Sequence, residues 1–533
     1  MTYPIKHVVV LMLENRSFDH LLGQRKGVDG VLTPSGQLNP ALSNPMTSAS
    51  TPGPKSYPVA GNAPFAVDPQ DVYRQAKAIY GGPSHSFPST SQQLFGTKTP
   101  TAANLAAPSF GGFIDNYVSV LEQEAHRKNP SPQEIGLPMA TFDPSQLPVL
   151  NALADNFCVC DNWFSDVPGP TQPNRLFVHA ATSMGFTRNV WDYKFTAKTI
   201  YEALDDAKQS WAVYYFDLRD TDSFPNVKTR VKQILPFATF YDQAKAGTLP
   251  AYSFLCPLYG DTSPTQQSSS EHCPSDIRYG EMLIADVYEA LRVAPGWNET
   301  LLIVTYDEHG GFYDHVAPPD TVPPDSYTSP TAYDQQQAKS NPKENGYLVK
   351  PDCNFGFDRL GLRVPTILVS PWIKQGVDHT QYQHTSILAT LHDLFGTTPL
   401  TKRDEAARSF AARFTELTSP RTGTPTALPR PAIPAPNPDQ LQKPPSANQE
   451  ELAPMLAHLD GHADSGKTVP LPPTRGQTAS YVAQRVAAHN AFHRKSPPPP
   501  PGPTVKATMT TKARTKTAPA ANRTSTRAAG RRK

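Results

Sequence analysis

The chain has 533 residues, enough to bury a large core, and its 49 Lys and Arg against 47 Asp and Glu give a net charge of +2. Residues 501–533 carry nine of these basic residues and no acidic one, which leaves residues 1–500 at −7 and excludes a broadly basic, nucleic-acid-binding surface. Proline accounts for 58 residues, about twice its usual share of roughly 5%, which excludes a mostly helical protein and requires long loops.

Apolar runs are short throughout the chain. The first, residues 8–12, is far below the roughly 18 residues that a membrane span needs. It also begins too early to follow a signal peptide, so the chain as written is expected to be cytoplasmic. Five cysteines are too few for a disulfide scaffold. We interpret Cys158 and Cys160 as buried side chains on opposite faces of a strand.

The predicted elements alternate between strand and helix. Residues 6–14 (KHVVVLMLE) predict a buried first strand, and residues 25–135, rich in Pro, Ser, Gly and Asn, predict long surface excursions. Further elements follow in this order: a helix running into a strand (147–159), a helix (199–207), a strand (211–215), a helix (277–293), strands (298–306 and 365–369) and a helix (384–395). This order predicts an α/β fold with a mostly parallel sheet, helices on both faces, and a ligand site at the carboxyl ends of the strands.

The composition changes near residue 419. Nine prolines between positions 420 and 445 predict an extended segment. We therefore expect a folded domain over residues 1–419, a Pro-rich linker with short helices over 420–495, and a disordered basic tail over 496–533.

Polar side chains follow the first predicted strand. Glu14 and Asn15 place a carboxylate and an amide oxygen side by side, and both can reach one hard cation. Arg16 and Asp19 can pair across the same turn. This segment is either a polar turn or part of a cation site.

A second segment, residues 168–175 (PGPTQPNR), holds one hydroxyl in a stiff Pro/Gly turn before a predicted helix. At a helix N-terminus, Thr171 would face unpaired N–H groups that suit a phosphate. Alternatively, Thr171 only caps the helix.

A third segment, residues 306–315 (YDEHGGFYDH), follows the strongest predicted strand. Asp307 and Glu308 would repel each other unless a cation or a proton lies between them. The segment therefore indicates a metal or acid–base site.

Weaker candidates lie outside these three segments. His272 and Asp276 either share one site or cap the helix that follows, and His85 and His384 are isolated histidines of the kind that is usually structural. Taken together, a hydroxyl, oxygen-rich ligands and histidines at strand ends favour phosphoryl transfer. A G-x-S-x-G elbow, a P-loop and a G-x-G-x-x-G fingerprint are absent from the sequence, which disfavours an esterase, a nucleotide-driven motor and a dehydrogenase.

Three motifs in order resemble those of the phosphoesterase family of bacterial phospholipases C, plant non-specific phospholipases C and related acid phosphatases: ENRSFDHLLG (14–23), VPGPTQPNR (167–175) and YDEHGGFYDHVAPP (306–319). The resemblance spans about residues 4–398. It implies a three-layer α/β/α sandwich of the alkaline-phosphatase-like kind with a Pro-rich C-terminal extension.

The resemblance also implies roles for individual residues. One divalent ion (Mg, Ca, Mn or Zn) would be surrounded by Glu14, Asn15, Thr171, Asp307 and Glu308, with Thr171 as the nucleophile. Further catalytic residues would be His85, His272, Asp276 and His384. Bracing or structural roles would fall to Arg16, Asn174, Arg175, Asp314 and His315.

The implied activity is phospholipase C-type hydrolysis of phospholipid phosphodiesters through a phosphothreonine. Family acid phosphatases carry Ser where Thr171 stands, so the alternative is a phosphomonoesterase that uses the same site. We expect a phospholipid or another phosphate ester as substrate, at most peripheral membrane contact, no nucleic acid and no partner protein. Much of the family is secreted, unlike the chain as written.

Overall fold

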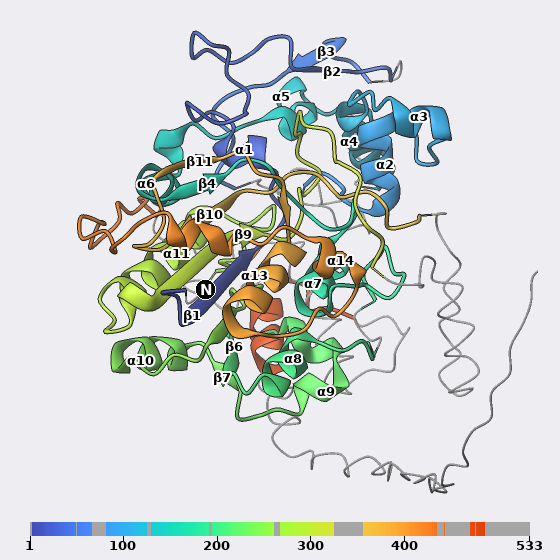
Figure 1. The fold of residues 1–533 in the computed structure, drawn as a ribbon. Helices are drawn as coiled ribbons and strands as arrows, with labels where there is room; N and C mark the ends of the chain where they lie inside the picture. Colours follow the sequence, from blue (N-terminus) through green and yellow to red (C-terminus); the bar gives the residue numbers. More distant parts are fainter. Residues whose placement is uncertain are drawn as a thin grey trace, which may run out of the picture. The chain divides into compact units, whose positions relative to one another are not determined.

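The computed structural model describes residues 3–48, 51–66, 82–124, 129–190, 194–260, 267–324, 355–433, 442, 470–474 and 476–485 (Figure 1). The chain divides into two compact units, Met1–Lys495 and Ser496–Lys533, and every described residue belongs to the first. The predicted disordered tail therefore lies outside the described residues.

An eight-stranded sheet forms the centre of the fold. Its order is β11 (Gly376–Asp378), β4 (Cys158–Cys160), β10 (Thr366–Val369), β9 (Thr300–Tyr306), β1 (His7–Leu13), β8 (Tyr252–Leu255), β6 (Trp211–Tyr215) and β7 (Ile234–Pro236). In this sheet β10 is antiparallel to both neighbours and the other pairings are parallel. The mostly parallel sheet is confirmed. Strand β9 is buried along its whole length, as expected for an apolar strand covered on both faces.

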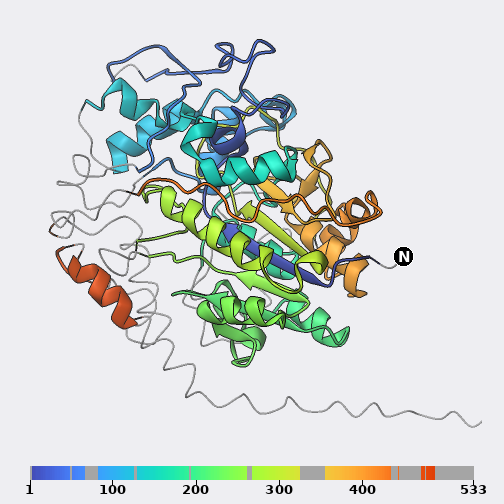
Figure 2. The ribbon, with the colours of Figure 1, turned by 90° about the vertical axis from the view of Figure 1, so that its left-hand side faces the viewer.

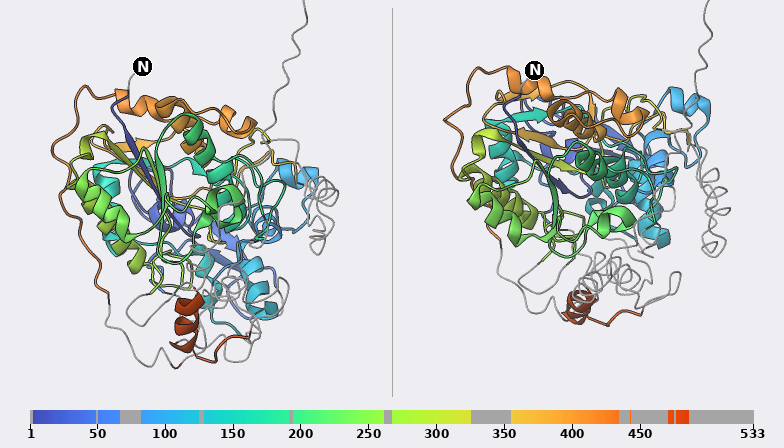
Figure 3. Two further views of the ribbon diagram at one scale, coloured as in Figure 1. Left: turned by 90° about the horizontal axis from the view of Figure 1, so that it is seen from below. Right: turned by 60° about the horizontal axis from the view of Figure 1, so that its bottom comes forward.

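Helices form a layer on each face. The helices α6 (Pro148–Asn156), α10 (Ala238–Ala246) and α11 (Arg278–Arg292) precede β4, β8 and β9, and α11 contacts the other two. The helices α7 (Thr171–Ala180), α8 (Ile200–Asp206) and α13 (Thr385–Phe395) form the other layer. The connections that contain α6, α10 and α11 run toward the β11 edge of the sheet, and the one that contains α7 and α8 runs toward the β7 edge. Because such crossovers are right-handed, opposite directions place the helices on opposite faces. In Figure 2 the yellow-green α11 lies in front of the strands, and Figure 3 shows α11 and the orange α13 on different sides of them.

Two parts of the sequence-based prediction were incomplete. Strand β8, in the middle of the sheet beside β1, was not predicted. Residues 25–135 were predicted to be surface excursions, but they contain α2 (Phe87–Phe95), α4 (Phe113–Ser119) and a smaller hydrophobic core around Phe113 and Leu94. The short strands β2 (Ser43–Pro45) and β3 (Ser56–Pro58) lie in the same part, at the top of Figure 1.

Residues 420–433 lie along α11. Leu428 is buried in the main core, and its backbone N–H donates to a Glu289 carboxylate oxygen at 3.0 Å. The Arg430 guanidinium pairs with Asp286 and Glu289, both at 2.7 Å. This segment is therefore tied to the sandwich by apolar and ionic contacts.

The remaining described part of the C-terminal extension is mostly a helix over residues 476–485, whose Val482 also belongs to the main core. Within the described residues, we find no helix with the length and apolar character needed to cross a membrane.

The prediction for the cysteine pair was wrong. Possible ligand atoms of Cys158, Cys160 and Asp378 lie within 4.8 Å of one another, so the two thiols share a face. Residues i and i+2 of a strand point the same way. The Arg413 guanidinium pairs with the Asp378 carboxylate beside the two thiols.

Candidate active site

The register of the two central strands brings the first and third sequence motifs together. Leu13 at the end of β1 pairs with Tyr306 at the end of β9, so Asn15 and Asp307 emerge side by side. The Asn15 N–H donates to Asp307 Oδ1 at 2.9 Å. Asn15 adopts a φ of 60°, a conformation that asparagine tolerates better than most residues.

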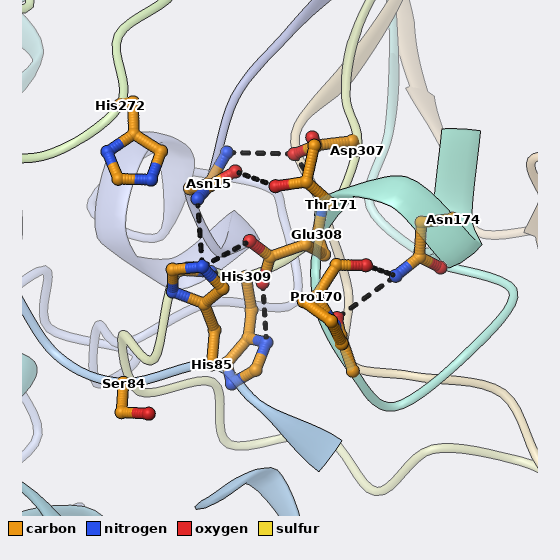
Figure 4. Close-up of polar contacts among 12 residues, drawn as sticks. Asn15, Ser84, His85, Pro170, Thr171, Asn174, His272, Asp307, Glu308 and His309 are labelled. Carbon is orange, nitrogen blue, oxygen red and sulfur yellow. Dashed lines mark hydrogen bonds and ion pairs between the residues drawn. The ribbon is translucent and has the colours of Figure 1, made fainter. Parts of the chain in front are cut away.

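Thr171 is the first residue of α7 and is 5% exposed. The N-cap of α7 is Pro170, and the Thr171 hydroxyl donates instead to Asn15 Oδ1 at 3.2 Å (Figure 4). The capping alternative is thus not the one that the structure adopts. Asn174 holds the preceding turn through donations to the carbonyl oxygens of Val167, Gly169 and Pro170.

The loop after β9 depends on two glycines with positive φ. A Cβ on Gly310 would lie 2.0 Å from the Asn15 carbonyl oxygen, and one on Gly311 would lie 2.6 Å from that of Ser84. Both positions also have φ in the left-handed region, +65° and +74°. These glycines allow the loop to approach the backbone of Asn15 and of Ser84 closely.

Glu308 has the features of a cation ligand. It is fully buried, and its Oε1 has no hydrogen-bond partner among the described residues. His85 Nε2 lies 3.7 Å from this oxygen. Burial raises the pKa of the Glu308 carboxyl above its usual range, and while His85 opposes this rise, the Asp307 charge adds to it. Carboxylate and amide oxygens beside a hydroxyl fit a hard divalent ion such as Mg²⁺ or Ca²⁺.

Arg175 supports the site from behind Asp307. Its Nε donates to Asp307 Oδ2 at 3.0 Å, and its Nη1 donates to Asp220 at 2.6 Å and to Tyr259 Oη at 2.8 Å. Burial lowers the pKa of Arg175, but Asp220, Tyr259 and Asp307 outweigh it and the pKa lies well above the ordinary value. Glu14 is also buried and close enough to act electrostatically on Arg175.

Two of the predicted histidines lie on the side of Asn15 away from Asp307 (Figure 4). His85 Nε2 is 3.2 Å from Asn15 Nδ2, and the rings of His85 and His272 have centroids 5.7 Å apart. The Cys273 carbonyl oxygen accepts a hydrogen bond from His272 Nδ1. Asn15 therefore links His85 to Thr171, and His272 lies beyond His85.

His384 and Asp276, the other two predicted catalytic residues, are hydrogen-bonded to groups other than Asn15 and Thr171. The buried His384 ring donates from Nε2 to the Asp307 carbonyl oxygen at 2.7 Å and accepts at Nδ1 from Trp163, so it positions the backbone of Asp307. Asp276 binds the guanidinium and the backbone N–H of Arg278 at the start of α11. The structure thus gives Asp276 a contact within its own turn.

Asp314 and His315 belong to a separate cluster with Asp19. The Arg363 guanidinium donates to Asp314 at 2.9 Å and to Asp19 at 3.0 Å, and His315 Nδ1 lies 2.7 Å from Asp19. Two cations already face these carboxylates, so the cluster is a brace between the first and third motifs.

Three residues near the site were not singled out from the sequence. His309 lies between two predicted ligands and the glycines, so its place in the third motif could have identified it. Burial lowers the pKa of His309 to about 3, which keeps the ring neutral. Asp220 and Gln93 come from segments without a recognisable motif and reach the site only through the fold.

The family and the relatives that this chain matches make it a hydrolase that acts on phosphoester bonds. The sequence profile of the phosphoesterase family matches residues 5–398, and the chain belongs to this family.

Named relatives include plant and bacterial enzymes. The chain is 37% identical over 455 residues to non-specific phospholipase C5 of Arabidopsis thaliana, covering 81% of this chain and 78% of the relative. It is 28% identical over 428 residues to phospholipase C B of Mycobacterium tuberculosis, covering 74% and 73%. Among solved structures, an alkaline phosphatase superfamily protein from Vibrio parahaemolyticus aligns with a TM-score of 0.30 at 13% identity, covering 51% of this chain and 64% of that one.

Proposed function

We propose that this chain is a metal-dependent phospholipase C that hydrolyses phospholipid phosphodiesters through a phosphothreonine at Thr171. One observation carries the proposal: the Thr171 hydroxyl, at the first turn of α7, is bonded to Asn15, whose backbone is bonded to Asp307. The names of the plant and mycobacterial relatives support the choice of a phospholipid diester.

The reaction has two steps. Thr171 Oγ attacks phosphorus in line, and the bond from phosphorus to the diacylglycerol oxygen breaks. His85 or His272 protonates this leaving oxygen. Thr171 loses its hydroxyl proton to solvent as it attacks. Water then attacks the phosphothreonine and gives one proton to the same imidazole; the bond from phosphorus to Thr171 Oγ breaks, the phosphorylated headgroup leaves, and Thr171 Oγ takes up a proton from solvent.

One divalent ion would be held by Asp307, Glu308, Asn15, Glu14 and Thr171. When bound, it would lower the pKa of the nucleophilic hydroxyl and neutralise the phosphate oxygens. The α7 N-terminus adds N–H groups and a partial positive charge at the same place. Arg175 holds the Asp307 carboxylate in position from the opposite side.

The test compares two substrates on one preparation. Phosphatidylcholine and a simple phosphomonoester are assayed with chelator and after Mg²⁺, Ca²⁺, Mn²⁺ or Zn²⁺ is restored. Metal-dependent preference for the diester supports the proposal. Preference for the monoester would mean that the same site is that of a phosphatase. Equal rates with and without chelator would contradict the proposed metal dependence.

Variants of the nucleophile complete the test. Thr171→Val keeps the side-chain shape without the hydroxyl and should lower kcat/KM by about 10³-fold or more. Thr171→Ser keeps the hydroxyl and should retain most of the activity. Acid-quenched protein should carry phosphate on Thr171, and an unlabelled Thr171 with full activity would remove the covalent step.

A further inference from the structure

Gln93 on α2 has an amide orientation that its neighbours fix. Its Nε2 donates to the Ser84 carbonyl oxygen at 2.7 Å and to Asn116 Oδ1 at 3.0 Å. A carbonyl oxygen can only accept, so the nitrogen of this amide must lie on that side. The Gln93 Oε1 therefore faces His309, 2.9 Å from Nε2.

This orientation determines which nitrogen of His309 carries hydrogen. Gln93 Oε1 can only accept, so the hydrogen of the neutral ring is on Nε2, and Nδ1 presents a lone pair. Nδ1 has no hydrogen-bond partner among the described residues and lies 3.4 Å from Glu308 Oε2. Gln93, Glu308 and His309 are all fully buried.

A lone pair and a carboxylate oxygen at this distance repel each other in a dry interior. Glu308 Oε2 already accepts from the Gly310 N–H, and Oε1 has no hydrogen-bond partner. A cation between His309 Nδ1 and the Glu308 carboxylate would remove this repulsion.

We propose that His309 Nδ1 is an additional donor to the divalent cation at Glu308, and that Gln93 is the positioning residue that holds His309 in the required tautomer. This inference rests on the metal site proposed above. It adds one nitrogen to an oxygen-rich set, and nitrogen favours Zn²⁺ and Co²⁺ more than Ca²⁺.

The experiment measures Zn²⁺ and Ca²⁺ affinity of the chelator-treated full chain by competition with a chromophoric chelator. His309→Phe should lower Zn²⁺ affinity about 10–100-fold, and Gln93→Leu about 10-fold. Ca²⁺ affinity should change far less in both variants. Nitrogen-15 shifts of His309 in the metal-free protein should show hydrogen on Nε2, and Gln93→Leu should mix the two tautomers.

Two further variants serve as controls. Gln92→Leu changes the preceding residue of α2, whose Oε1 accepts from Asn116 without contacting His309, and should leave zinc affinity unchanged. Gln93→Glu still accepts from His309 Nε2–H and should keep more zinc affinity than Gln93→Leu. This pair decides the question if His309→Phe does not fold.

The outcomes separate the two proposals. Wild-type protein that binds neither ion overturns the metal site and this inference together. If the wild-type protein binds zinc and His309→Phe binds it as tightly, only the roles of His309 and Gln93 are overturned. The same holds if Gln93→Leu and Gln93→Glu bind zinc as tightly as each other. A selective loss of zinc affinity with the tautomer change supports them.

Discussion

At the scale of single residues, the site depends on buried side chains that hydrogen-bond to the residues that would meet the substrate. Arg175 lies between Asp307 and Asp220 and is itself 3% exposed, so each carboxylate limits how closely the guanidinium approaches the other. Asp220 in turn accepts from Tyr259 Oη at 2.6 Å. Asp220 is thereby linked through Arg175 to a predicted metal ligand, Asp307.

Asp220→Asn should lower kcat/KM by about 10–100-fold, the usual effect of removing a partner of a metal ligand. The guanidinium would then pair more tightly with Asp307 and compete with a cation for it. Asp222→Asn is the matched control, because Asp222 pairs with Arg219 at 2.8 Å. Equal activity losses in both variants would argue for general destabilisation.

Sequence reasoning identified residues that sit directly after predicted strands, since parallel strands end at one edge of a sheet. It therefore predicted Asn15, Asp307 and Glu308, and the Pro/Gly turn predicted Thr171; the structure brings Asn15 into hydrogen-bond contact with both Asp307 and Thr171. It could not find Gln93 or Asp220, because their segments show no pattern and only the tertiary fold brings them to the site. His384 was predicted as a catalytic residue, and a sequence does not show that both of its ring nitrogens are hydrogen-bonded.

At the scale of elements, the continuous apolar runs of β1 and β9 were predictable. Strand β8 has four residues including a buried Ser253, so neither its length nor its hydrophobicity distinguishes it from a loop. Helix α2 reads as a polar, Ser-rich segment, and its burial comes from packing against α4.

The acidic loop after β9 gives an element-scale prediction. Gly310 and Gly396 have φ of +65° and +70°, but a Cβ would clash with Asn15 only at Gly310 and meets nothing within 4 Å at Gly396. Gly396→Ala should cost about 1–2 kcal/mol from the left-handed conformation alone. Gly310→Ala should destabilise more and abolish hydrolysis. Thermal unfolding and the diester assay measure both, and equal losses of stability would contradict the close approach of the two segments.

The brace that joins the first and third motifs should respond to pH. Burial lowers the pKa of His315, but its bond to Asp19 and the charges of Asp19 and Asp314 outweigh this and raise the pKa to about 9, against the opposing Arg363. Because the folded pKa is above the ordinary value of 6.5, the stabilisation is complete below about pH 6.5 and is lost as the pH rises through about 9.

His315→Gln should therefore remove part of the fall in thermal midpoint between those two pH values. The exposed His379, which pairs with Asp161 at 2.9 Å, offers the control variant His379→Gln. If wild-type protein and His315→Gln show parallel midpoint curves across this range, the protonated His315 does not stabilise the brace.

At the scale of the whole molecule, the C-terminal extension contributes to the sandwich before the second unit begins. Residues 420–433 bury Leu428 and connect to α11 through Arg430, and a Tyr288 hydroxyl donates to the Pro425 carbonyl oxygen at 2.5 Å. The composition of this stretch predicts only an extended, Pro-rich segment, because proline content does not reveal which surface the segment covers. Its contacts indicate that it stabilises the catalytic unit.

Two truncations test this role. A chain ending at residue 419 lacks Leu428 and the Arg430 pairs, and the lost burial of this one leucine costs about 1.5–3 kcal/mol. Its thermal midpoint should fall by several degrees, since about 1 kcal/mol shifts the midpoint of a large domain by roughly 2–4 °C. A chain ending at residue 495 keeps the whole first unit and should unfold at the wild-type temperature. Leu428→Ala in the full chain should reproduce part of the fall in midpoint that the chain ending at 419 shows. If the midpoint is unchanged in both, residues 420–433 do not stabilise the unit by packing on α11.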